Sequence, residues 1–233
     1  MLTKKKCRSI LAAALFVPMI GLSVGLLESP SASAAPTSSS QPVGGPGSAG
    51  GGSNARSGPA AGGSSRTVGT VSKSGFTLTT SAGQKVTIDE TSSTKYKKGT
   101  TSASKSAVTK GESVLVLGTV SSTVIKATQV IVQPTSSGSA ASTAAAVIPF
   151  QKGAPTTAKQ VGQIPASYSE GSGTIVSGTT ANKATEAALA AYPGGVVDRV
   201  VKLSNGEYEV HQIGVNWPHH IFVNQDFKVV GAE

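Results

Sequence analysis

Residues 113–132 read SVLVLGTVSSTVIKATQVIV, and this pattern predicts a β-hairpin. Two runs rich in β-branched residues, Ser113 to Val120 and Thr123 to Val132, are separated by a short serine turn. Runs of this kind, bounded by turn residues, are typical of strands. We therefore expect the centre of the chain to form a sheet.

Upstream of this hairpin the same pattern continues in three shorter runs. They are Thr67 to Ser72, Phe76 to Thr80 and Lys85 to Ile88. The triplet Gly69-Thr70-Val71 recurs as Gly118-Thr119-Val120, which indicates that the first and last hairpins close a short barrel. We predict a small all-β domain over residues 67–132.

Residues 180–233 predict one helix laid across an antiparallel sheet. Thr180 is placed to cap a helix that runs to about Ala191, and Pro193-Gly194-Gly195 ends it. The strand patterns that follow are Val196 to Leu203, Glu207 to Ile213, His219 to Val223 and Lys228 to Val230. This region is therefore predicted to be an α+β domain.

Two resemblances to known families agree with these expectations. An alanine-rich helix, then Ala191-Tyr192-Pro193-Gly194-Gly195-Val196-Val197 and Gly206-Glu207-Tyr208-Glu209-Val210, resembles the PepSY domain family over about 180–233. That resemblance implies a non-catalytic module, known from propeptides of thermolysin-like metallopeptidases and from envelope proteins, and associated with restraint of peptidases. Residues 67–132 look like a small β-barrel domain family of unknown function found in secreted bacterial proteins, and the return Gly111 to Val116 carries that likeness.

Two segments have the composition of linkers. Residues 35–66 are almost entirely Ala, Gly, Pro, Ser and Thr, which cannot bury enough apolar surface to offset the entropy of ordering. Residues 133–179 are rich in Ser, Ala and Thr, with apolar islands at Val147 to Phe150 and Ile175-Val176 that predict one or two docked strands. We expect a mainly β protein with an α+β part: a small β-barrel-like domain and a C-terminal helix-on-antiparallel-sheet domain, joined by disordered linkers.

Residues 1–34 have the three parts of a secretory signal peptide. A basic start is followed by an apolar run from Ile10 to Leu27 and by the cleavage signal Ala32-Ser33-Ala34. We predict cleavage after Ala34, with Ala32 and Ala34 as the recognised residues, and a secreted or cell-wall-associated product. The alternative is an uncleaved anchor, because 18 residues are at the lower edge of what spans a bilayer. Membrane contact is expected only through this segment.

Cleavage also limits the chemistry of the exported part. It removes Cys7, the only cysteine, so no thiolate remains for catalysis or metal binding. The formal charge falls from +9 to +6, with 16 Lys and Arg against 10 Asp and Glu. The sequence shows no HExxH helix, phosphate-binding loop or recognisable Ser-His-acid arrangement. We therefore predict neither an enzyme nor a bound cofactor.

The three histidines, His211, His219 and His220, form a candidate metal site. If the predicted strands pair, His211 approaches one of the other two across the sheet, and neutral imidazoles bind Zn or Cu. Adjacent residues of a strand point to opposite faces, so only one of His219 and His220 joins His211. Surface histidines beside a packed tryptophan are the alternative.

Trp217 is the only tryptophan, and it follows a predicted hairpin loop. An exposed loop tryptophan is a strong interface anchor, whereas folding back onto the sheet would bury it. We predict partner-binding residues at Trp217, Pro218, His219 and Tyr208. The expected partner is another exported protein, and the PepSY resemblance implies a peptidase.

The 67–132 domain is basic, with eight lysines against Asp89, Glu90 and Glu112. The cluster Lys95-Tyr96-Lys97-Lys98 predicts binding of an anionic cell-wall polymer. Nucleic acid is not expected as a partner, because an exported protein rarely meets it. A solvated charged surface is the alternative.

Overall fold

A computed structural model describes residues 59–80, 83–133, 147–155 and 157–233. The predicted signal peptide, its cleavage residues Ala32 and Ala34, and the predicted linker up to residue 58 lie outside these ranges. The described chain is mainly β, with an α-helix, α2 (Gly178–Ala191), on an antiparallel sheet, so the predicted fold class is confirmed. Within the described ranges, no helix has the length and hydropathy needed to cross a bilayer.

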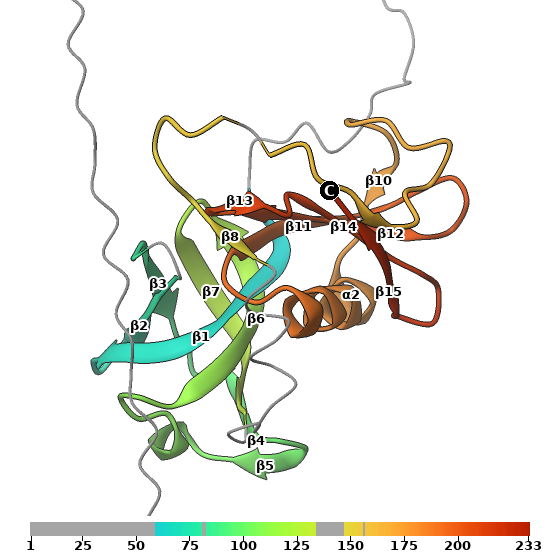
Figure 1. Cartoon of the computed structure of the whole chain (residues 1–233). Coiled ribbons are helices and arrows are strands. Elements are labelled where there is room, and N and C mark those ends of the chain that lie inside the picture. The colour runs from blue at the N-terminus through green and yellow to red at the C-terminus, as the bar shows by residue number, and fades with distance from the viewer. Residues whose placement is uncertain (1–58, 81–82, 134–146, 156) are drawn as a thin grey trace, which may run out of the picture. The chain divides into compact units, whose positions relative to one another are not determined.

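The N-terminal part of the described chain is a closed five-stranded barrel (Figure 1). Its strands are β1 (Ala60–Val71), β2 (Gly75–Thr79), β3 (Lys85–Asp89), β6 (Ser113–Ser121) and β7 (Val124–Val132). The order is β1-β2-β3-β7-β6, and β6 returns to β1. Strands β3 and β7 are parallel and the other neighbours antiparallel. This order and these directions are those of the OB-fold barrel.

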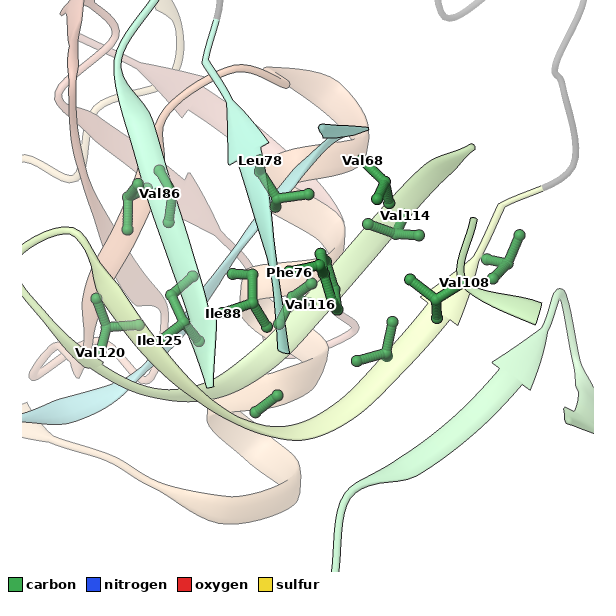
Figure 2. Packing of buried hydrophobic residues seen from close by; sticks show 14 residues of the cluster. Val68, Phe76, Leu78, Val86, Ile88, Val108, Val114, Val116, Val120 and Ile125 are labelled. Carbon is green, nitrogen blue, oxygen red and sulfur yellow. The ribbon is translucent and has the colours of Figure 1, made fainter. Parts of the chain in front are cut away.

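Alternating side chains of these strands fill the barrel interior. In β3, Val86 and Ile88 are fully buried while their neighbours along the strand are exposed, which is the period of two that the sequence shows. Figure 2 shows Leu78, Val116 and Ile125 gathered with them between the strands. Each fully buried side chain of this kind contributes roughly 1.5–3 kcal/mol, so this cluster is a main source of the barrel's stability.

A short hairpin and a 3-10 turn are inserted between β3 and β6. They are β4 (Lys95–Lys98), β5 (Thr101–Ala103) and η1 (Lys105–Ala107). Strand β4 pairs in parallel with the second half of β7, and β5 ends the main path of the sheet. The sequence pattern did not predict these strands, because lysine-rich segments of three or four residues carry no alternation of apolar side chains.

The C-terminal part is an antiparallel sheet in the order β11-β12-β14-β15. Its strands are β11 (Val196–Lys202), β12 (Tyr208–Ile213), β14 (His220–Val223) and β15 (Val229–Ala232). All four lie close to their predicted bounds. Helix α2 begins at Gly178, slightly before the predicted Thr180, and ends at the predicted Ala191.

Helix α2 packs against both parts of the protein. Its buried residues include Ala184 and Ala188, which share one apolar cluster with Val210 of the sheet and with Leu115 and Leu117 from the outside of the barrel. Small alanine side chains let the helix approach both surfaces closely. The barrel and the C-terminal sheet are consequently halves of one compact unit.

Strand β1 also joins the two halves through hydrogen bonds. Its residues 60–67 pair with β6, and Gly63 and Ser64 pair with β11 on the other side. A Cβ atom at Gly62 would overlap the carbonyl oxygen of Val197, so glycine is required where the strands meet. The predicted linker boundary at Arg66 is therefore wrong, because the small residues 60–66 form a buried strand rather than a spacer.

The described parts of the predicted 133–179 linker run along the sheet (Figure 1). Strand β8 (Ile148–Pro149) pairs with β13 (Val215–Trp217), β9 (Val161–Gly162) pairs with β15, and β10 (Thr174–Ile175) pairs with β11. The two apolar islands identified in the sequence are thus docked strands, as expected. Strand β9 was not predicted.

Candidate functional site

The C-terminal sheet has a polar cluster on the face opposite α2. We call it the histidine–carboxylate cluster, and its members are Tyr168, Asp198, Arg199, Glu209, His211 and His220. Strands β11, β12 and β14 contribute five of these side chains, and Tyr168 comes from the segment between β9 and β10. Polar groups that are removed from water need hydrogen-bond partners. Most of this cluster is connected by such bonds, although the buried Nε atom of Arg199 has no partner among the described residues.

Asp198 reaches the cluster through a bulge in β11. The pairing of β11 with β12 shifts register between Val197 and Arg199, and Asp198 lies at the shift. Such bulges re-aim side chains. Here the Asp198 Oδ1 atom lies 2.6 Å from His211 Nδ1, and its Oδ2 atom lies 3.3 Å from Arg199 Nη1. One carboxylate therefore holds both the imidazole and the guanidinium.

Glu209 is the second carboxylate of the cluster, and its side chain is fully buried. Its Oε1 atom lies 2.7 Å from His220 Nδ1. The hydroxyl of Tyr168 lies 2.9 Å from the same nitrogen, and its ring contacts Phe222 edge-on. Burial, followed by the nearby charge of Glu209, raises the pKa of Tyr168, so this hydroxyl keeps its proton.

The three predicted metal-ligating histidines are divided between two environments. His211 and His220 are directly opposite each other on β12 and β14, with ring centroids 5.2 Å apart. His219 does not join them; its Nδ1 lies 3.3 Å from the Gln212 carbonyl oxygen, and burial lowers its pKa. The expectation that only one of the adjacent pair meets His211 is confirmed by this register. In the described ranges, no group of three or more His, Cys, Asp or Glu side chains is arranged to hold a metal ion.

Of the two arrangements left open for Trp217, exposure in a loop and folding back onto the sheet, the structure shows the second. Trp217 lies in β13 and is 1% exposed. Its indole N–H donates to the Lys159 carbonyl oxygen at 2.6 Å, and its ring contacts Tyr192 edge-on at 5.4 Å. The adjacent Pro218 is buried as well. The tryptophan therefore fixes Ile148 and Lys159 to the sheet.

Tyr208, another predicted partner-binding residue, is also buried. Its ring stacks on Phe227 with centroids 5.6 Å apart, and it belongs to the apolar cluster beneath α2. Of the four predicted contact residues, only His219 is partly exposed. The loop around Trp217 is thus part of the core, because an amphipathic ring gains more by packing on a nearby sheet than by exposure.

A groove opens beside the histidine–carboxylate cluster. Its volume is 540 Å³, and it lies between the end of the β6–β7 hairpin, the start of β1 and the start of α2. Asp198 and Arg199 line it, together with Ser121 and Thr128. The cluster is therefore adjacent to a space that solvent and small molecules can enter.

A second candidate surface is the β4–β5 hairpin, residues 95–103, which we call the lysine hairpin. Its three lysines, Lys95, Lys97 and Lys98, make no ion pair with the described residues. The carboxylate of Glu90, which interacts with Tyr96 of the hairpin, pairs with another lysine: its Oε2 atom lies 2.6 Å from Lys105 Nζ. Burial, and then Glu90, raise the pKa of Tyr96 to about 12.

Sequence reasoning found the histidines but missed the groups that hold them. Glu209 alternates regularly with apolar residues in β12 and looks like a solvent-facing position, and nothing in the sequence reveals the bulge that aims Asp198. Tyr168 lies in a segment that was predicted to be linker. Comparison with protein families, curated proteins and solved structures found no match for this chain.

Proposed function

We propose that the protein is an exported, non-catalytic binding protein that attaches to an anionic phosphodiester polymer of the cell envelope through the lysine hairpin. The observation that carries this proposal is the arrangement of three lysines in the four residues of β4, without ion-pair partners in the described chain. A repeating anionic polymer offers phosphates at regular spacing to such a strand.

The distribution of charge along the chain supports this choice. Residues 60–133 hold eight lysines and Arg66 against Asp89, Glu90 and Glu112, whereas in residues 147–233 acidic and basic residues nearly balance. Lys73 lies at the same end of the barrel as η1, because its carbonyl oxygen accepts a hydrogen bond from Lys105 Nζ at 2.8 Å. The positive field is therefore concentrated on the barrel half.

The hairpin presents its lysines from a fixed base. Tyr96 packs against the apolar cluster of the barrel, and Thr94 donates from its hydroxyl to the Ala127 carbonyl oxygen at 2.8 Å. Because the side chains of a strand alternate, Lys95 and Lys97 point away from the side that Tyr96 anchors. A rigid base lowers the entropy lost when the lysines bind a polymer.

Export places this surface where envelope polymers are. The signal-peptide pattern of residues 1–34 supports an extracytoplasmic location, which also removes nucleic acid as a partner. The peptidase-restraining role implied by the PepSY resemblance stays a prediction. It now lacks an exposed contact residue at Trp217, Pro218 or Tyr208.

The test is retention of the purified chain on immobilised wall polymer with a phosphodiester backbone. We expect the wild type to bind and to elute in about 1 M NaCl, because the Debye length then falls to about 3 Å. The triple variant Lys95→Gln, Lys97→Gln, Lys98→Gln should lose at least about tenfold in affinity, a loss of about 1.4 kcal/mol.

The matched control removes the same charge from the other half of the protein. Lys152, Lys202 and Lys228 are exposed, and their triple change to Gln should leave retention almost unchanged. Equal losses for both triple variants would show that only net charge matters and would overturn the lysine hairpin as the site. Stronger retention on anionic lipid vesicles than on the polymer would overturn the choice of polymer.

A further inference from the structure

The histidine pair has the spacing of two ligands of one metal ion. His211 and His220 are opposite residues of an antiparallel pair, and the neighbouring Gln212 N–H donates to the His219 carbonyl oxygen at 2.7 Å. They therefore occupy a non-hydrogen-bonded position, where side chains approach most closely. Two imidazoles bound to one ion through Nε2 have centroids about 4.5 to 5 Å apart, from the cis square-planar angle that Cu²⁺ prefers to the tetrahedral angle of Zn²⁺, given metal–nitrogen distances of about 2.0 Å. The observed separation is 5.2 Å.

Both rings are oriented by carboxylates in the way that metal-binding histidines usually are. His211 Nδ1 bonds to Asp198 and His220 Nδ1 bonds to Glu209, at 2.6 and 2.7 Å. A carboxylate only accepts hydrogen bonds, so each neutral ring carries its proton on Nδ1 and keeps the lone pair on Nε2. At His220 the Tyr168 hydroxyl oxygen, 2.9 Å from Nδ1, is then a second acceptor for the same proton. Such partners fix the tautomer and increase the basicity of the ligating nitrogen.

The Nε2 atoms can be reached from outside. Neither is among the buried atoms that lack a partner in the described residues, and each histidine side chain is 15% exposed. Asp198 also lines the 540 Å³ groove. Both rings are therefore partly open to solvent.

We propose that His211 and His220 bind one divalent transition-metal ion through their Nε2 atoms, in an open site that prefers Cu²⁺ to Zn²⁺. The absence of a third His, Cys, Asp or Glu ligand among the described residues leaves the other coordination positions to water or to a group of a second molecule. Imidazole suits both metals, and Cu²⁺ binds more tightly in a given site. This proposal does not depend on the lysine hairpin.

The test is calorimetric titration of the purified full chain with CuCl₂ and with ZnCl₂. We expect one Cu²⁺ per chain with a Kd in the micromolar range and weaker binding of Zn²⁺. His211→Gln and His220→Gln should each lower the Cu²⁺ affinity at least tenfold, and Asp198→Asn should lower it about tenfold through the orienting bond. His219→Gln is the matched control, and it should bind as the wild type does.

A second measurement on the wild type does not depend on variants that fold poorly. Proton–nitrogen NMR spectra of the imidazoles should show Nδ1-protonated tautomers for His211 and His220, and ZnCl₂ should shift their two Nε2 signals together. No binding of either metal at about 100 µM, a loss in His219→Gln as large as in His211→Gln, or a Zn²⁺ shift of the His219 ring alone would each overturn the proposal.

Discussion

The barrel interior is buried and the outer face of the C-terminal sheet is largely covered, but the two regions contain opposite kinds of side chain. The barrel interior, which includes Leu78 and Ile88, is apolar throughout its cluster. The outer face of the sheet includes Glu209, His211 and His220, and hydrogen bonds and ion pairs offset the cost of removing these polar groups from water. An apolar interior stabilises the fold, whereas buried charge contributes little net stability and is often retained for another reason. This difference directs attention to the sheet face as a binding site.

The largest predicted loss of stability comes from breaking the pair between Glu209 and His220. Glu209→Ala should lower the free energy of unfolding by about 4 kcal/mol, because it leaves His220 without its carboxylate and opens a cavity. Urea unfolding measures the loss.

The double variant Glu209→Leu, His220→Leu is the informative control. It removes both partners and places apolar groups beside Phe222, so most of the lost stability should return. If the double variant is as unstable as Glu209→Ala, the fold requires the Glu209–His220 pair for its stability. The pair would then not be one that is kept for binding.

The next effect concerns the apolar half. Leu78→Ala should cost about 3 kcal/mol, because Leu78 is fully buried in the barrel. Unfolding should be followed both by far-UV circular dichroism and by the fluorescence of Trp217, which lies in the other half. The two transitions should shift together because the halves form one unit. An unshifted Trp217 transition would show that the halves unfold separately.

A smaller effect is expected where the two halves meet. Gly62→Ala should cost about 2 kcal/mol, because the added methyl group overlaps the backbone carbonyl of Val197. Gly69→Ala in the same strand is the control, since its methyl would meet the rotatable hydroxyl of Thr77 at 2.9 Å. Thermal unfolding compares the two, and equal losses would remove the special role of Gly62.

The smallest predicted effect tests the edge of the polar cluster. Tyr168→Phe removes the hydroxyl that lies 2.9 Å from His220 but keeps the ring on Phe222, so it should cost about 1 kcal/mol. Urea unfolding with a matched Tyr192→Phe variant measures this difference. No loss in Tyr168→Phe would exclude the hydroxyl from the cluster's hydrogen bonding.

Several elements could be predicted from the sequence because their signals are local. Alternation identified β2, β3, β6 and β7, and the alanine stripe ended by Pro193-Gly194-Gly195 identified α2. The prediction that only one of His219 and His220 meets His211 followed from the alternation of side chains along a strand. Residues 60–66 could not be predicted, because small polar residues are typical of a spacer and of a crowded strand junction alike.

By itself the sequence determined the fold class, the strands with apolar alternation, and the candidate histidines, since these depend on periodicity and spacing within short segments. The tertiary structure alone decided that Trp217 is buried, that β1 joins both halves, and that Asp198 and Glu209 hold the two histidines. These features depend on contacts between residues far apart in the chain and on one bulge. Local sequence patterns do not predict such contacts or such a bulge, because the same short segment is compatible with several tertiary arrangements.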